Sequence, residues 1–438
     1  MSDPALGFAG LGMIGIALLT GYPMAFSFLF VALIVGYLGI GNLVFYLLTF
    51  QFFGTMRDTT LAAIPLFLFM GYVLEQSGLM DRVFRALRLM LSGLSGSLYL
   101  ITLLVAIIFG AATGIVGASV TILGVMAAPV MKESGYDTRL SAGAISAGGT
   151  LGILIPPSIL LIVMGPVMGV PVTDLFAAAI VPGLMLGAIY ILYTLIRCWI
   201  NPKLGPPLIG AEAEVGPAAK AREFFAGVFP VAMIIVATLG VILAGIATPT
   251  DAAATGSFAS LVLALSYRSL NFSQFKTAVF RTALTTSFIM FLLVSANFFG
   301  AVFSRLGSDK VLTEWLLNLP LTGTSMLVLM LAIVFVLGSP LEWIPIVLVV
   351  VPIFMPTVTH MGVDPLWFAI LVAVTLQTSW LTPPMALSSY FLKGVVPSWR
   401  MGDIYAGQVQ FIVLQLVVVG LLMAFPGIVG WLPSLIDN

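Results

Sequence analysis

A double proline in the middle of an apolar run is the feature of this sequence that most restricts its fold. Residues 148–158 read Gly-Gly-Thr-Leu-Gly-Ile-Leu-Ile-Pro-Pro-Ser, within an apolar stretch over residues 140–165 that is long enough to cross a bilayer. Proline has no backbone N–H and crowds the preceding turn, so a helix must break here. At membrane depth, irregular backbone is tolerated only where protein or water satisfies its polar groups. The break is therefore expected to line a cavity.

A second copy of this pattern lies 227 residues further along the chain. Residues 376–384 read Leu-Gln-Thr-Ser-Trp-Leu-Thr-Pro-Pro and also interrupt a long apolar run. The same offset pairs Gly96 with Gly323, Pro129 with Pro356, Gly135 with Gly362, Asp137 with Asp364, and Pro156-Pro157 with Pro383-Pro384. This ungapped register predicts an internal repeat, with halves over residues 1–200 and 224–438 and a polar linker over residues 201–223. Paired interrupted segments in corresponding halves indicate the binding site of a secondary transporter.

The composition agrees with a membrane protein and excludes several other classes. Apolar residues make up 61% of the chain and charged residues 8%, which indicates an integral membrane protein in a lipid bilayer. The net charge is zero and no basic cluster occurs, which argues against a nucleic-acid partner. One cysteine excludes an intrachain disulfide, and one histidine leaves no metal site of the His/Cys kind.

The apolar runs predict an all-α fold of two repeats, with about ten transmembrane helices plus two re-entrant hairpins. The first half is predicted to contain helices over residues 5–20, 24–50 and 61–74, an amphipathic arm on the membrane surface over 79–91, a hairpin over 97–131, a broken helix over 140–165 and a helix over 175–197. The second half is predicted to contain helices over residues 228–245, 252–265 and 282–302, an arm over 305–317, a hairpin over 323–357, a broken helix over 366–392 and a helix over 405–429. Each half makes five crossings, so the two repeats must be inverted.

The distribution of Lys and Arg predicts the orientation. With the N-terminus outside, fourteen of these residues fall on the inner side, Arg281 among them, and only Arg57, Arg305 and Lys310 fall on the outer side. Because short cytoplasmic loops are enriched in Lys and Arg, both termini are expected in the periplasm and the linker in the cytoplasm.

The hairpins and broken helices contain one charged residue, Glu342. A substrate anion there would have to be held by the positive ends of half-helices and by hydroxyl groups. Backbone carbonyls freed at the same breaks suit Na⁺, a hard cation that prefers oxygen ligands. Glu342 itself could be a proton or cation ligand, or only an acid at the first turn of the hairpin's second helix.

Two cation sites follow from this reasoning. The first would use Thr113, Gly114 and Ser119 at the first hairpin tip with Gly149, Thr150 and Gly152 at the first break. The second would use Gly338 and Ser339 with Gln377, Thr378, Ser379 and Thr382. The predicted substrate ligands are Thr113, Ser119, Ser158, Ser339 and Thr382. The alternative interpretation is that these small residues only allow close helix packing.

Three motifs resemble those of one transporter family. They are Gly-Thr-Leu-Gly-Ile-Leu-Ile-Pro-Pro-Ser over residues 149–158, Gly-Ile-Ala-Thr-Pro-Thr-Asp-Ala-Ala-Ala over 245–254 and Ile-Pro-Leu-Phe over 64–67. Together they are similar to the large membrane subunit of TRAP transporters, the tripartite ATP-independent periplasmic systems. The first tip departs from the family's Ser-Gly-Ser-Ser pattern, since it reads Thr-Gly-Ile-Val, and Leu341-Glu342 stands where Leu-Asp is common.

The resemblance implies a mechanism and partners. It implies a Na⁺-coupled importer of organic acids in the bacterial inner membrane, in which a transport domain over residues 97–165 and 323–392 slides like an elevator against a scaffold. It also implies a separate small four-helix membrane subunit and a periplasmic substrate-binding protein. The run over residues 377–384 looks closest to the mannitol/chloroaromatic branch, which suggests a 2-oxo acid or lactate; C4-dicarboxylates are also considered.

Three other functions have different sequence requirements. A stand-alone sodium/carboxylate symporter of the same architecture would need no partner and remains open. An intramembrane hydrolase would need a nucleophile and a base at depth, and the lone His360 and lone deep acid Glu342 argue against it. A passive channel does not need two closed, inverted hairpin sites.

Overall fold

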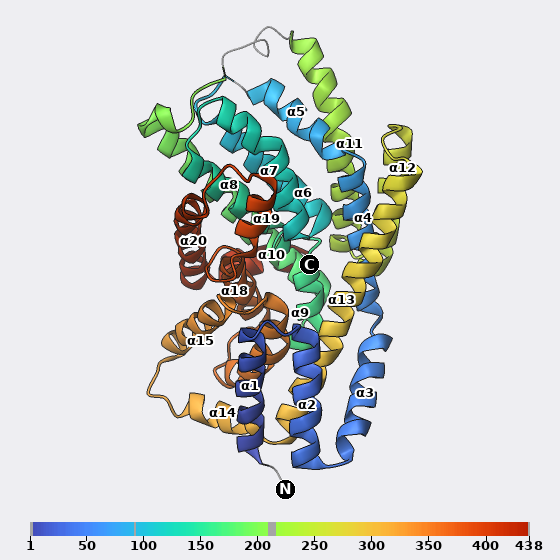
Figure 1. Ribbon diagram of the computed structural model, residues 1–438, viewed down its shortest axis with the longest axis vertical. Coiled ribbons are helices and arrows are strands. Elements are labelled where there is room, and N and C mark those ends of the chain that lie inside the picture. The colour runs from blue at the N-terminus through green and yellow to red at the C-terminus, as the bar shows by residue number, and fades with distance from the viewer. Residues whose placement is uncertain (1–2, 92, 209–215, 437–438) are drawn as a thin grey trace.

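The computed structural model describes residues 3–91, 93–208 and 216–436. Within these residues the regular structure is helical and contains no strand, as the sequence predicts (Figure 1). Seven of the described helices are long and apolar enough to cross a membrane. The all-α class is therefore confirmed, and the side of the bilayer that each terminus faces stays a prediction.

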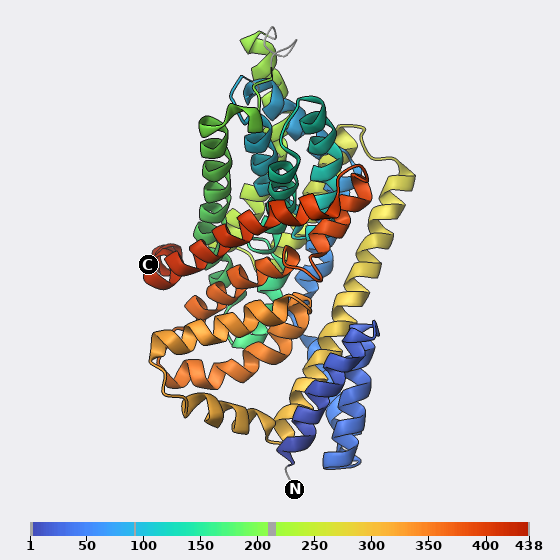
Figure 2. The same cartoon turned by 60° about the vertical axis from the view of Figure 1, so that its left-hand side comes forward.

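The first helices form a cluster at one end of the molecule. This cluster contains α1 Pro4–Leu19, α2 Met24–Ile40 and α3 Leu43–Arg57, and it packs on the lower part of the long helix α13 Phe272–Arg305 (Figure 2). The single helix predicted over residues 24–50 is wrong, because the chain turns at Gly41, where φ is +60°. Only glycine adopts this backbone region without strain, and the apolar residues on both sides conceal the turn.

The next segments of the chain lead to the amphipathic arm. A 3₁₀ turn, Thr59–Ala62, leads into α4 Ala63–Gln76, and α5 Leu79–Leu91 occupies the residues predicted for the arm. The apolar face of α5 is buried, and the Arg82 guanidinium lies 4.9 Å from the centre of the Tyr267 ring. The arm therefore packs on the second half of the chain through its apolar face and through a cation–π contact.

The next four segments follow the predicted hairpin and broken helix. Helices α6 Ser97–Thr113 and α7 Val116–Glu133 turn at Gly114, and α8 Thr138–Thr150 passes through the 3₁₀ turn Leu151–Ile153 and the double proline before α9 Ile159–Met168. Helix α10 Val172–Ile200 ends this half.

The polar linker is fastened to the start of the first hairpin. The backbone N–H of Gly96 and the hydroxyl of Ser95 both donate to the carbonyl of Gly205, over 2.8 and 3.0 Å. The chain's one cysteine, Cys198, is buried between these two glycines. A short turn, Pro202–Leu204, lies within this part of the linker, and residues 209–215 lie outside the described residues.

The second half differs from prediction mainly in the ends of its helices. Its elements are α11 Pro217–Leu243, α12 Pro249–Ser266, α13, α14 Ser308–Leu317, α15 Gly323–Gly338, α16 Trp343–Pro345, η4 Ile346–Val350, α17 Val351–His360, α18 Pro365–Gln377, η5 Thr378–Trp380, α19 Leu387–Val395, α20 Met401–Ala424 and α21 Gly427–Ile436. Helix α13 begins well before the predicted residue 282, so Arg281 lies inside it. The last predicted helix ends early, because the chain bends at Phe425 and Pro426 before α21.

The two broken helices have the same local structure. Helix α8 and its 3₁₀ turn recur 227 residues later as α18 and η5. Asp137 accepts a hydrogen bond from the backbone N–H of Leu140 (2.8 Å), and Asp364 accepts one from that of Leu366 (2.9 Å). Both double prolines contain a cis peptide bond. This correspondence supports the predicted repeat; the division into moving and fixed parts stays a prediction.

Helices α8 and α20, which come from different halves of the chain, pack closely against each other. Helix α20 crosses α8 so tightly that a Cβ atom added at Gly407 would lie 2.0 Å from the carbonyl oxygen of Arg139. The Arg139 side chain also pairs with Asp403 on α20 over 2.9 Å. A Cβ atom added at Gly143 of α8 would lie 2.6 Å from the carbonyl oxygen of Gly407, so the two backbones touch directly.

Candidate functional site

The first hairpin tip lies directly against the first helix break. A Cβ added at Gly110 would lie 2.9 Å from the Cα of Gly152, so the two backbones are in contact. Gly114 turns the tip with φ +60°, and a Cβ there would lie 3.2 Å from the carbonyl oxygen of Pro157 and 3.8 Å from that of Gly152. Two carbonyl oxygens of the break thus approach the tip, as a cation site requires.

Hydroxyl groups around this tip are turned toward the backbone. Thr113 Oγ1 donates to the carbonyl of Phe109 (3.0 Å), Ser119 Oγ donates to that of Ile115 (2.8 Å), and the two hydroxyl oxygens are 3.5 Å apart. At the break, the hydroxyl of Thr150 donates to Ala147 O (2.7 Å), and the hydroxyl of Ser158 donates to Ile153 O. A hydroxyl whose proton is held by a carbonyl presents its lone pairs elsewhere, which suits a cation.

Gly149 has a packing role. A Cβ added there would lie 2.9 Å from the backbone nitrogen of Val120, so the glycine lets α8 approach α7. This favours close packing for Gly149, whereas Gly114 and Gly152 bring carbonyl oxygens together.

The second tip meets the second break in a comparable way. A Cβ added at Gly338 would lie 3.0 Å from the Cβ of Ser379. The Ser339 hydroxyl donates to the carbonyl of Pro383, and the backbone N–H of Met385 donates to Ser339 O over 3.3 Å. The remaining hydroxyls again donate to carbonyls within the helix: Thr378 to Thr375 O (2.6 Å), Ser379 to Leu376 O (2.6 Å) and Thr382 to Thr378 O (2.7 Å).

Gln377 has an unusual environment. Its side chain is fully buried, and neither its amide oxygen nor its amide nitrogen has a hydrogen-bond partner among the described residues. An unsatisfied buried polar group costs about 1–3 kcal/mol. Gln377 occupies the repeat position of Thr150, so its amide oxygen is available to a cation at the matching place in the second half.

A cavity of about 470 Å³ lies where both hairpin tips and both breaks meet α4 and α13. The first residues of α7 (Val116 and Gly117) and of α9 (Ile159 and Leu160) line it. Helix N-termini carry partial positive charge, so this cavity suits an anion. Of the predicted site residues, Gly114 is the one among the described lining residues of the cavity.

A match to a family model shows which family the chain belongs to. Residues 11–428 match the family model of the DctM component of the tripartite ATP-independent periplasmic transporter. The chain belongs to this family.

Individual relatives agree with this assignment. The DctM-family chain is 28% identical over 388 residues to the C4-dicarboxylate TRAP transporter large permease protein DctM of Pseudomonas aeruginosa, covering 88% of this chain and 89% of the relative. It is 30% identical over 383 residues to a putative TRAP transporter large permease protein of Haemophilus influenzae (86% and 87%). It is 27% identical over 430 residues to the sialic acid TRAP transporter large permease protein SiaM of Vibrio cholerae (97% of each).

A solved structure shares the fold. The crystal structure of the Alcanivorax borkumensis YdaH transporter superposes with a TM-score of 0.64 at 19% identity, covering 88% of this chain and 89% of that one. At this identity the likeness supports the fold of the DctM-family chain and says nothing about its substrate.

Glu342 lies at the cavity of this TRAP permease chain. It is half-buried, occupies the N-cap position of α16 and makes no capping hydrogen bond there. The position agrees with an acid near a helix start, and the cavity-facing location keeps a ligand role open. His360, the last residue of α17, is exposed.

Sequence reasoning missed four polar residues of the cavity wall. Tyr72 and Glu75 come from α4, and Arg281 and Thr285 come from α13. The predicted helix over residues 282–302 starts too late, because α13 begins at Phe272 and includes Arg281. The predicted helices over residues 61–74 and 282–302 stop next to Glu75 and Arg281, so these two charges fall outside them, whereas Tyr72 and Thr285 lie inside and received no role. Charges flanking two apolar runs were the only available signal.

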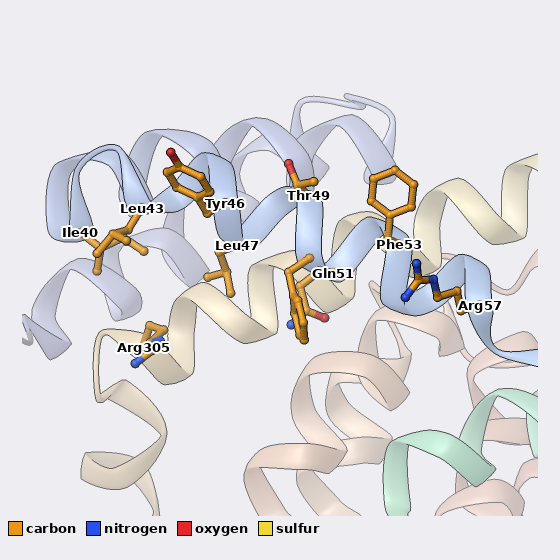
Figure 3. A pocket seen from close by; sticks show the side chains of 10 residues that line it. Ile40, Leu43, Tyr46, Leu47, Thr49, Gln51, Phe53, Arg57 and Arg305 are labelled. Atoms are coloured by element: carbon orange, nitrogen blue, oxygen red, sulfur yellow. The ribbon is translucent and has the colours of Figure 1, made fainter.

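A larger groove of about 880 Å³ lies elsewhere on the permease chain (Figure 3). It follows α3, and its lining includes Leu43, Tyr46 and Phe53, with Arg57 and Arg305 at its ends. None of the described residues that line it belongs to a hairpin tip or a helix break. An exposed apolar surface of this kind suits contact with lipid, so we do not place the transport site there.

Replacing Gly114 with alanine should destabilise the permease chain more than the same change at Gly245. Both glycines have positive φ, so alanine costs about 1–2 kcal/mol at either position. Gly114 also has a close neighbour, Pro157 O, whereas a Cβ at Gly245 would meet no atom of the described residues within 4 Å. We expect about 1 kcal/mol of additional loss, measured as a lower thermal unfolding midpoint in detergent. Equal losses would contradict the close tip–break contact.

Proposed function

We propose that the chain is the large permease subunit of a Na⁺-coupled importer of organic acid anions in the bacterial inner membrane. The observation that carries the proposal is the cavity formed by both hairpin tips, both helix breaks and the N-termini of α7 and α9. Membership of the DctM family supports the transporter assignment. The relatives are named for C4-dicarboxylate and sialic acid, both acidic solutes.

The proposed cation sites are built from neutral oxygens. Carbonyls of Gly152 and Pro157 and hydroxyls of Thr113, Ser119 and Thr150 would hold the first Na⁺, and Ser339, Gln377, Thr378 and Ser379 would hold the second. Na⁺ would supply the positive charge that offsets the anion. With two Na⁺ per monoanion each cycle moves one net charge, and the membrane potential contributes about 2.3 kcal/mol per 100 mV.

The proposed cycle is an elevator. Residues 97–165 and 323–392 would move together against a scaffold that includes α4 and α13. A periplasmic binding protein would deliver the anion, and a small four-helix membrane subunit would extend the scaffold. Family membership supports this tripartite arrangement.

Uptake into proteoliposomes tests the proposal. Vesicles containing this chain and its small subunit are supplied with labelled 2-oxo, hydroxy and C4-dicarboxylic acids, with the binding protein and an inward Na⁺ gradient each added or omitted. Uptake that requires both supports the proposal. Uptake without binding protein would instead support a stand-alone sodium/carboxylate symporter, and uptake indifferent to Na⁺ would exclude sodium coupling.

Removing the hydroxyl of Thr150 or Thr378 should weaken Na⁺ dependence. We expect Thr150→Ala and Thr378→Ala each to raise the Na⁺ concentration for half-maximal uptake by about tenfold, because each loses a candidate oxygen ligand. Thr375→Ala is the matched control, since this buried threonine makes the same helix-internal hydrogen bond one turn earlier, to Leu371 O over 2.8 Å. Unchanged Na⁺ dependence in both variants would refute the assigned sites.

A further inference from the structure

One wall of the cavity carries a fixed, partly exposed guanidinium. Arg281 Nη1 on α13 donates to Glu75 Oε1 on α4 over 2.6 Å. Beside this pair, the hydroxyls of Tyr72 on α4 and Thr285 on α13 are 2.8 Å apart. These contacts join the two helices and hold the arginine at the cavity that the hairpin tips also line.

Several N–H donors of the Arg281 guanidinium have no partner among the described residues. Its side chain is 50% exposed, while that of Glu75 is only 12% exposed. Among the described residues, the guanidinium makes no hydrogen bond other than the one to Glu75. A guanidinium has five N–H donors, and two of them together match the two oxygens of a carboxylate. The edge of Arg281 that faces away from Glu75 can therefore bind an anion.

Apart from Arg281, the positive charge at the cavity comes from the N-terminal ends of α7 and α9, each about half an elementary charge. Arg281 is the one basic residue among the described residues that line it, and the acids are Glu75, which is paired, and Glu342, from the second hairpin tip. Most other lining residues are apolar, among them Leu68, Val116, Ile159, Phe288, Ile344 and Phe391. A second carboxylate would lose water among these side chains or lie near Glu342.

We propose that Arg281 binds the carboxylate of the transported acid and that the cavity selects monocarboxylates with an apolar body over dicarboxylates. Glu75 is the positioning residue, because its carboxylate orients the guanidinium of Arg281 and partly neutralises its positive charge. This inference rests on the proposed function and adds to it a substrate class and a contact from outside the predicted transport domain. The carboxylate would bind at α13, and its apolar body would lie against the aromatic residues of the second tip and break.

A direct measurement of ligand binding tests this inference independently of transport. Isothermal titration of the purified chain with its small subunit, in saturating Na⁺, would use 4-methyl-2-oxopentanoate, benzoate and succinate as probes. We expect a monocarboxylate to bind at least about tenfold tighter than succinate. Arg281→Gln should weaken that binding at least about tenfold, and Arg281→Lys should weaken it less, since lysine keeps the charge without the paired donors. Lys276→Gln, an exposed basic residue on the same helix, is the control and should change nothing.

Glu75 provides a readout that a purely structural role would not give. Glu75→Gln keeps a hydrogen-bond acceptor for Arg281 and removes a negative charge near the bound anion, so monocarboxylate binding should tighten severalfold. Thermal unfolding midpoints identify any misfolded variant. If Arg281→Gln misfolds, the weaker binding expected of Arg281→Lys is the test.

The outcomes are distinct. Succinate binding as tightly as the monocarboxylates, or Arg281→Gln binding like the unmodified chain, would overturn the inference even if Na⁺-driven uptake persists. Monocarboxylate binding that depends on Arg281, without any Na⁺-driven uptake, would support the site and refute the proposed function. Absence of both binding and uptake for every acid would refute both.

Discussion

Replacing Gly407 with alanine is expected to destabilise the protein by about 3 kcal/mol. The new methyl group would lie 2.0 Å from the carbonyl oxygen of Arg139 and 2.9 Å from the backbone nitrogen of Gly143. Both atoms belong to the backbone of α8, so no side-chain rotation can relieve the clash, and α20 must move away from the first broken helix. A thermal unfolding midpoint lowered by several degrees, measured on the purified protein in detergent, would show this.

Gly402 on the same helix is the matched control. A Cβ added there would meet no atom within 4 Å, so Gly402→Ala should leave the midpoint unchanged or raise it slightly, because alanine favours a helix over glycine. If both variants unfold at the same temperature, α8 and α20 are not in backbone contact as described.

Replacing Gly110 with valine should nearly abolish the response to Na⁺. A side chain there would push against the Cα and nitrogen of Gly152, both 2.9 Å from the added Cβ, and separate the first tip from the first break. The candidate ligands would then lose their common geometry, and we expect the apparent Na⁺ affinity to fall about 10–100-fold. Both Na⁺-dependent uptake and the shift of the unfolding midpoint with added Na⁺ report this affinity.

Gly240→Val distinguishes this effect from a general cost of valine within a helix. Gly240 lies within α11, and a Cβ there meets nothing within 4 Å. The control should keep its Na⁺ response. A Gly110→Val protein that folds and responds normally to Na⁺ would remove the first tip from the cation site.

The breaks and turns that position the site were predictable because they depend on local backbone chemistry. Pro156-Pro157 and Pro383-Pro384 must interrupt a helix wherever they occur, and the repeat register located both without knowledge of the fold. The hairpin tip at Gly114 was predictable for the same reason. Local rules failed at Gly41, where a single glycine turns an apolar run that has no polar residue to mark its end.

The cavity wall was not predictable, because it depends on which helices pack together. Glu75 and Arg281 are separated by most of the first half of the chain and by the linker, and each alone resembles a charge at the end of a membrane helix. Only tertiary contact brings them into one ion pair. The sequence likewise did not distinguish Gly149, which packs against Val120, from Gly114, which turns the chain toward two carbonyl oxygens.

The burial of Cys198 has a practical consequence for measuring motion. The chain's one thiol is enclosed beside Gly96 and Gly205, so a maleimide or a spin-label reagent should leave the unmodified protein unlabelled. Cysteines introduced at the exposed positions Val328 on α15 and Val279 on α13 would then be the only reactive groups. The distance between two such labels, recorded with and without Na⁺, would follow the hairpin against α13 within the otherwise native chain.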